Sequence, residues 1–200
     1  MLRNNSKSIC QTCQVQFENI SEDHCLGCYR QGTLELCLDC QKWKKKGHSV
    51  KNEAIFKYNT AMKDYFSKYK FQGDYRLKDC FAQDIKKVLK KYKGFALVPI
   101  PISKERMRER QFNQVHGLLD GIKIPYQDIL LRLDDEKQSS KTKLERHQVR
   151  NRFFLREEEE LPDNILIIDD IYTTGSTLWG VYQLLYENGA KNVKSFTLAR

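Results

Sequence analysis

Short runs of apolar residues predict the strands of this protein. Residues 165–168 are four consecutive aliphatic side chains, and residues 95–98 form a second run of this kind. Such runs suit strands that are buried on both faces, as in a parallel sheet with helices on either side. A shorter run at 55–58 predicts a third strand.

Segments with helical spacing separate these runs. Residues 60–71 carry large apolar side chains on one face, a pattern that predicts a helix packed on a core. Residues 77–92 repeat the pattern with lysines on the outer face, and a third helix is predicted over 177–187, before Asn188 and Gly189. Strands that alternate with helices indicate an α/β fold built on a parallel sheet.

Acidic and hydroxyl side chains follow the run 165–168 directly. Asp169 and Asp170 stand at its carboxyl end, where open α/β sheets bind ligands, and two carboxylates there suit ribose hydroxyls or hydrated Mg²⁺. A small, hydroxyl-rich loop then precedes a predicted helix, whose amino end favours an anion. The residues of this loop are Thr173, Thr174, Gly175, Ser176 and Thr177. The alternative interpretation is an ordinary strand, turn and helix with capping residues.

A second group of charged residues follows the other long apolar run. Pro99 and Pro101 end the strand predicted at 95–98, and a segment rich in arginine and lysine extends over residues 104–114. A basic loop at a strand end is a candidate anion site. A helix face with i,i+4 charge pairs explains the same pattern.

Six of the seven cysteines form three Cys-x-x-Cys pairs near the amino end. Thiolates at this spacing converge on one ion, and two pairs complete a tetrahedral Zn²⁺ site. We favour a structural zinc site made of Cys25, Cys28, Cys37 and Cys40, because the link containing Gly32 can close a compact ribbon. Cys10 and Cys13 are then surplus. They could join Cys25 and Cys28 instead, accept His24 or His48 in a second site, or remain from a longer amino end. Buried structural thiols or a redox pair is the alternative.

Composition narrows the class of partner. The chain has 200 residues and a formal net charge of +9, which favours polyanions such as nucleic acids or phosphorylated metabolites. We expect no membrane span, no secretory signal and a cytoplasmic location, where disulfides are rare.

A basic run with one aromatic residue follows the cysteines. Its lysines could contact phosphates while its indole stacks on a base, so it is a candidate nucleic-acid contact. The candidate residues are Lys42, Trp43, Lys44, Lys45 and Lys46, with Arg108 from the second charged segment. A solvated linker with Trp43 packed on the cysteine module is equally compatible with this run.

Residues 165–178 resemble the PRPP (5-phosphoribosyl-1-pyrophosphate) motif of type I phosphoribosyltransferases. The resemblance implies that Asp169 and Asp170 contact the ribose hydroxyls, and are the catalytic candidates if the site turns over, while residues 173–177 hold the 5-phosphate. It also implies that the basic loop receives pyrophosphate, with Ser103, Lys104 and Arg110 as candidates, and that Mg²⁺ enters with PRPP. By analogy we expect a parallel sheet of about five strands.

Taken together, the motifs resemble the ComF family over nearly the entire chain. They are the Cys-x-x-Cys ribbon, Val-Pro-Ile-Pro at 98–101, the charged segment 104–114 and the PRPP motif, with Gln138, Arg146 and Phe154 also at family positions. We therefore expect a zinc-binding ribbon at residues 1–48 and a phosphoribosyltransferase-like domain at 49–200. Gln111 departs from the family pattern, which commonly has glycine there, and this makes a close approach of pyrophosphate to the backbone less favourable.

The resemblance also implies a function. Members of the family act in DNA uptake during natural transformation, so the chain would handle incoming single-stranded DNA, bind PRPP or ribose phosphate in its pocket, and work with a helicase or channel protein. The alternative is an active Mg²⁺-dependent phosphoribosyltransferase of nucleotide metabolism or salvage, for which the sequence offers no evident base-binding pocket. A regulator that senses PRPP is a third interpretation.

Overall fold

The computed structural model describes residues 9–132, 153–156 and 161–200, so Gln138 and Arg146 lie outside the described residues. Its main sheet has four parallel strands in the order β1-β6-β5-β2. The strands are β1 (Asn52–Phe56), β2 (Ala96–Pro99), β5 (Asn164–Ile171) and β6 (Asn192–Ala199). β3 (Leu130–Arg132) and β4 (Phe153–Leu155) form a separate antiparallel pair. The α/β fold is confirmed, with four strands in the parallel sheet of the described residues rather than five.

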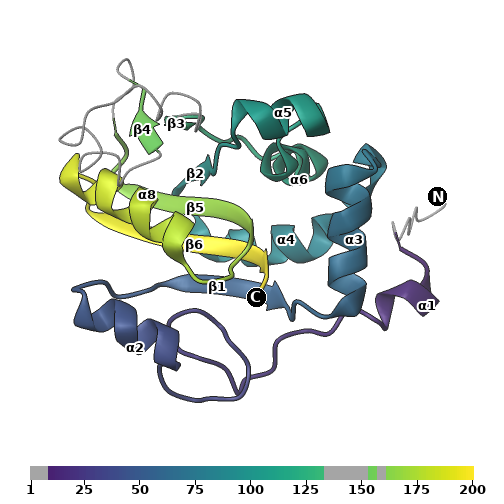
Figure 1. Cartoon of the computed structure of the whole chain (residues 1–200), viewed down its shortest axis with the longest axis horizontal. Coiled ribbons are helices and arrows are strands. Elements are labelled where there is room, and N and C mark those ends of the chain that lie inside the picture. The colour runs from purple at the N-terminus through teal and green to yellow at the C-terminus, as the bar shows by residue number, and fades with distance from the viewer. Residues whose placement is uncertain (1–8, 133–152, 157–160) are drawn as a thin grey trace.

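Helices cover both faces of this sheet (Figure 1). Ile165 and Ile167 pack against α8 (Ser176–Glu187), whereas Leu166 and Ile168 face α3 (Thr60–Phe71), α4 (Ala82–Leu89) and α6 (Gln114–Ile122). Successive side chains of a strand point to opposite faces. Because both faces of β5 are buried, its sequence is a continuous apolar run rather than an alternating one.

Two predicted elements differ from the structure. The helix expected at 77–92 is divided into the 3₁₀ helix η1 (Tyr75–Asp79), α4 and the 3₁₀ turn η2 (Lys90–Tyr92). Phe81 takes a non-helical backbone conformation between η1 and α4, and its ring packs 4.8 Å from that of Phe56. The strand predicted at 55–58 lies earlier, at β1.

Strand β6 was not predicted, because buried polar residues interrupt its apolar pattern. Ser195 and Thr197 are fully buried. The Ser195 hydroxyl donates to Asn52 Oδ1 at 2.8 Å, and Asn52 Nδ2 donates to the Thr197 hydroxyl at 3.1 Å. Buried polar groups are tolerated when they are paired in this way.

The cysteine-rich segment packs against the edge strand β1. It contains α1 (Gln11–Gln14) and α2 (Leu38–Lys45), which lie on different sides of the molecule in Figure 1. The Ile20 amide donates to the Ile55 carbonyl, and the Asn52 amide donates to the Gly27 carbonyl, both at 2.9 Å. No helix within the described ranges is long and apolar enough to cross a membrane.

Candidate functional site

A cleft of about 510 Å³ lies at the carboxyl ends of β5 and β2. It brings together side chains that are distant in sequence. Asp169 and Asp170 come from the end of β5, Thr173 and Thr177 from the loop and first turn of α8, and Arg110 from the end of α5 (Lys104–Arg110). We call this space the sugar-phosphate cleft and residues 173–177 the phosphate loop.

Asp169 and Asp170 form an acidic pair whose members differ in their environment. The Asp170 amide donates to Asp169 Oδ1 at 2.9 Å. Burial and the adjacent Asp170 carboxylate raise the pKa of Asp169 well above its usual range. Burial acts in the same direction on Asp170, but the Lys70 ammonium outweighs it and lowers the pKa of Asp170. One carboxylate thus stays ionised while the other holds a proton more readily, which suits both accepting from and donating to sugar hydroxyls.

Helix α3 also lines the cleft, although the sequence predicted only that it packs on the core. Its apolar stripe is buried as predicted, whereas Lys63, Ser67 and Lys70 line the cleft. Lys70 forms an ion pair with Asp170, and its ammonium lies 4.5 Å from the centroid of the Phe66 ring. The i, i+4, i+7 spacing of these three residues was a signal for a second functional face of the helix.

The phosphate loop is compact. Gly175 has φ +81° and stands immediately before α8. The Ser176 amide donates to the Thr174 hydroxyl oxygen at 3.4 Å, and the two hydroxyls lie 3.0 Å apart. Thr173 and Thr177 line the cleft, whereas the other three loop residues do not. The cleft therefore meets the amino end of α8, where unpaired backbone N–H groups favour an anion.

The three candidates for pyrophosphate do not share one position. Arg110 lines the cleft, is 8% exposed, and donates from Nη1 to Gln114 Oε1 at 2.9 Å. Ser103 caps α5 by accepting from the Arg106 amide at 3.2 Å. Lys104 is exposed at the start of α5, and neither it nor Ser103 lines the cleft, whereas Arg106 does.

Gln111 adopts the left-handed conformation that favours glycine, with φ +65°. Its side-chain amide donates to the Arg108 carbonyl and lines a neighbouring hollow rather than the sugar-phosphate cleft. Gln111, where the sequence comparison with the family suggested glycine, is thus not among the residues that line the cleft.

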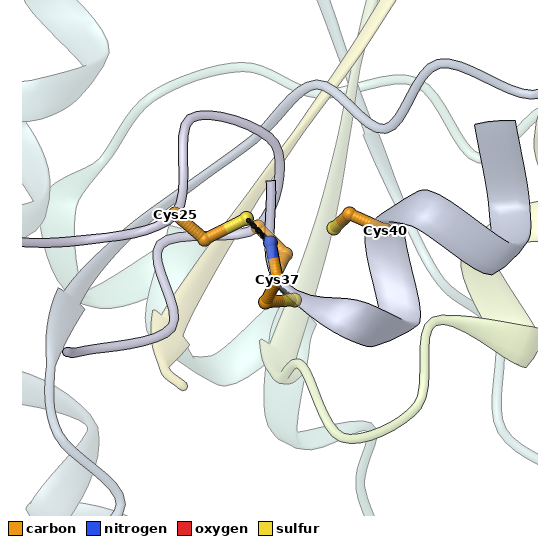
Figure 2. Close-up of side chains that lie close together, drawn as sticks. Cys25, Cys37 and Cys40 are labelled. Carbon is orange, nitrogen blue, oxygen red and sulfur yellow. Dashed lines mark hydrogen bonds between the residues drawn. The ribbon is translucent and has the colours of Figure 1, made fainter. Parts of the chain in front are cut away.

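Cys25, Cys28, Cys37 and Cys40 form a buried cluster in which all four sulfur atoms lie within 4.8 Å of one another. Figure 2 shows Cys25, Cys37 and Cys40 turned toward a common centre, with Cys40 projecting from α2. Amides support the Cys25 sulfur, since Cys37 N donates to it at 3.2 Å and Gly27 N at 3.4 Å. Four converging thiols with backbone donors fit a closed structural Zn²⁺ site.

The thiols of the cluster differ in how readily they ionise. Hydrogen bonding from Cys40 and the nearby Arg200 guanidinium lower the pKa of Cys28 to about 5, against the opposing effect of burial. Burial raises the pKa of Cys37, and hydrogen bonding to Cys28 raises that of Cys40, so zinc must displace protons from these thiols when it binds.

The remaining cysteine and histidine candidates lie elsewhere. Cys10 and Cys13 are exposed at α1. The His24 ring stacks on Tyr29 at 3.9 Å, and His48 is buried. Among residues 9–132, 153–156 and 161–200, no second group of three or more such ligands converges.

The basic run is exposed apart from its tryptophan. Lys42, Lys44 and Lys45 on α2, together with Lys46 after it, face solvent, as does Arg108 on α5. The half-buried Trp43 ring packs 5.5 Å from Trp179, and its indole Nε1 donates to the Thr174 carbonyl oxygen at 3.0 Å. Trp43 thus contacts the phosphate loop.

Comparison with known proteins supports this description. The family model of the phosphoribosyl transferase domain matches residues 111–200. The whole chain is 44% identical to the competence protein ComFC of Streptococcus pneumoniae and covers 91% of it. Identity to ComFC of Bacillus subtilis is 37%, over 97% of this chain and 85% of that protein. A hypoxanthine phosphoribosyltransferase structure from Staphylococcus aureus is 17% identical, with 60% of this chain and 61% of the other covered at a TM-score of 0.36, which is too low to bear on the fold. The chain therefore belongs to the ComFC competence-protein family and carries a phosphoribosyltransferase-like α/β domain beside a four-cysteine cluster that fits a zinc ribbon.

Proposed function

We propose that this protein is a cytoplasmic factor that handles incoming single-stranded DNA during natural transformation and binds PRPP or a ribose phosphate in the sugar-phosphate cleft. The observation that carries the ligand half of this proposal is the convergence of Asp169, Asp170, Thr173, Thr177 and Arg110 on one cleft. Carboxylates bind sugar hydroxyls, and the helix amino end, hydroxyls and guanidinium bind phosphate oxygens.

Magnesium fits the same acidic pair. Mg²⁺ keeps several waters and is commonly held by one or two carboxylates together with substrate phosphates. Lys70 already pairs with Asp170, which leaves Asp169 for a hydrated ion that enters with PRPP; Asp169 would give up its proton as the cation binds. Bound magnesium would neutralise charge on the pyrophosphate group.

Exposed cations and aromatic rings support the DNA half of the proposal. Lys44 and its neighbours on α2 supply one basic surface. α5 adds the exposed Arg106 and Arg108, and α3 ends in the Phe71 ring, which is 70% exposed. Single-stranded nucleic acid is bound by this combination of cations for phosphates and open rings for bases.

The ligand proposal is tested by calorimetric titration of zinc-loaded protein with ribose 5-phosphate and with Mg²⁺-PRPP. We expect Thr177→Val to weaken binding roughly tenfold, because it removes a hydrogen bond to a charged group. Thr12→Val, at an exposed threonine of α1, is the matched control and should bind as the unaltered protein does. Equal affinity of the two variants would contradict the assignment of the cleft.

The DNA proposal is tested by titrating labelled single-stranded DNA at several salt concentrations. Lys44→Ala should weaken binding and reduce the salt slope by about one. Lys191→Ala, whose ammonium pairs with Asp163 at 2.9 Å, is the control on another surface. An unchanged slope in Lys44→Ala would remove α2 from the DNA contact.

The same samples separate a binding protein from an enzyme. Release of pyrophosphate from Mg²⁺-PRPP that requires an added base, without affinity for DNA, would replace this proposal by that of an active phosphoribosyltransferase. Salt-dependent DNA binding without turnover is the expected result.

A further inference from the structure

The phosphate loop is held from outside by the helix that carries two of the clustered cysteines. Cys37 immediately precedes α2 and Cys40 lies within it. Trp43 follows Cys40 by three residues on the same helix, and its indole N–H donates to the Thr174 carbonyl at 3.0 Å. This hydrogen bond joins residues 131 positions apart in the sequence. It connects the loop directly to the helix that carries Cys40.

The contact leaves the loop little room to move. A Cβ atom added to Gly175 would lie 2.2 Å from Tyr172 Oη and 3.3 Å from Trp43 Nε1. Gly175 thus lies close to both the Tyr172 hydroxyl and the Trp43 indole. Its φ of +81° also requires a residue without a side chain.

A second chain of contacts, through Arg200, links the cysteine cluster to Tyr172, which precedes the phosphate loop. Arg200, after β6, donates from Nε to Cys28 Sγ at 3.4 Å and from Nη1 to the Tyr172 carbonyl at 3.3 Å. Its guanidinium also lies 4.8 Å from the centroid of the Tyr172 ring. Both Cys28 and Tyr172 are buried, so these bonds are shielded from water.

Two chains of contacts therefore link the cysteine cluster to the phosphate loop. One route runs from Cys28 through Arg200 and Tyr172 to Gly175, and the other runs from Cys40 along α2 through Trp43 to Thr174. Loss of the metal would weaken both routes together, because the bound ion holds the four sulfur ligands, and with them α2 and the Cys28 contact, at fixed positions.

We propose that Trp43 and Arg200 are positioning residues that hold the phosphate loop in its binding conformation, so that zinc in the cysteine cluster and a phosphate ester in the cleft bind cooperatively. This inference rests on the proposed function, because it concerns regulation of the same cleft. Coupling of two sites is reciprocal: the factor by which zinc raises phosphate affinity equals the factor by which phosphate raises zinc affinity.

The test uses the full zinc-loaded chain and ribose 5-phosphate as the probe. Trp43→Phe keeps a ring but removes the N–H donor. We expect it to weaken ribose 5-phosphate binding roughly fivefold, the equivalent of the ~1 kcal/mol net worth of a hydrogen bond. Trp179→Phe is the matched control, because it removes the neighbouring indole and leaves the Trp43 donor in place.

A second measurement uses the metal itself. Zinc affinity is determined by competition with a chromophoric chelator, with and without ribose 5-phosphate. We expect the ligand to raise zinc affinity about fivefold or more in the unaltered chain, and less in Trp43→Phe and Arg200→Met. In the Trp179→Phe chain, Trp43 is the sole tryptophan, and its emission should move to longer wavelength as zinc is withdrawn.

The outcomes separate the two proposals. If the unaltered chain does not bind ribose 5-phosphate, the proposed function and this inference both fail. If it binds but Trp43→Phe binds equally well, and zinc affinity ignores the ligand, only this inference is overturned. Reduced affinity for ribose 5-phosphate in Trp43→Phe, together with a zinc affinity that rises when the ligand is present, supports the inference. If the ligand raises zinc affinity in Trp43→Phe and Arg200→Met as much as in the unaltered chain, these two residues do not carry the coupling.

Discussion

Replacing Lys70 by methionine should strongly destabilise the protein. The change keeps most of the side-chain length but removes the ammonium that pairs with Asp170. The two side chains are only 12% and 9% exposed, so water cannot replace the lost partner. Removing one member of a buried ion pair typically costs about 3–5 kcal/mol, because the other charge stays buried and unpaired. We expect a loss of about 3 kcal/mol in the free energy of unfolding.

The matched control is the exposed ion pair of Lys57 and Glu18. Its N–O distance is 3.0 Å and its side chains are 37% and 54% exposed. Exposed pairs contribute about 0–1 kcal/mol, so Lys57→Met should cost less than about 1 kcal/mol. Adding Asp170→Asn to Lys70→Met should restore much of the lost stability, because it removes the orphaned charge.

Urea unfolding of the zinc-loaded proteins at pH 7.5, followed by circular dichroism, measures these differences. The pKa of Asp170 is lowered in the folded protein, so the stability that the pair provides is present above the unfolded pKa of about 3.9 and is lost as the pH falls through the folded value. In Lys70→Met the buried Asp170 carboxyl lacks the ammonium and takes up a proton at higher pH, so the difference in stability from the unaltered chain should shrink as the pH falls to 4 and below. A cost for Lys70→Met no larger than that for Lys57→Met would refute this account of the cleft.

Three further predictions concern stability. Gln111→Gly should raise the free energy of unfolding by up to about 1 kcal/mol in urea titrations, because it relieves the left-handed conformation; a loss would show that the Gln111 side-chain hydrogen bond dominates. Burial lowers the pKa of His48 from 6.5 to about 4, so on acidification the unfolded chain takes up a proton at this histidine before the folded chain does. The free energy of unfolding should therefore fall between pH 6.5 and 4 by about 3 kcal/mol more than in His48→Gln. Parallel pH profiles of the two proteins would contradict this. Gly117→Ala should cost about 1–3 kcal/mol in thermal unfolding although alanine favours helices, because the new Cβ would lie 2.2 Å from the Tyr69 hydroxyl.

Much of the fold followed from local patterns. The continuous apolar run of β5 and the aromatic stripe of α3 are properties of neighbouring residues, and both elements form where they were predicted. Strand β6 was missed because its buried Ser195 and Thr197 depend on Asn52, a partner 143 or more positions away. Their burial cannot be recognised from the strand alone.

The site shows the same division. The four clustered cysteines and the order of acids and hydroxyls at 169–177 were readable from sequence, because metal ligation and strand-end loops depend on short spacings. The pairing of Lys70 with Asp170 and the contact of Trp43 with the phosphate loop were not. Chain order determined which chemical groups this protein possesses, whereas packing of the helices on the sheet decided which of them meet, because those contacts join segments that only the folded core brings within a few ångströms.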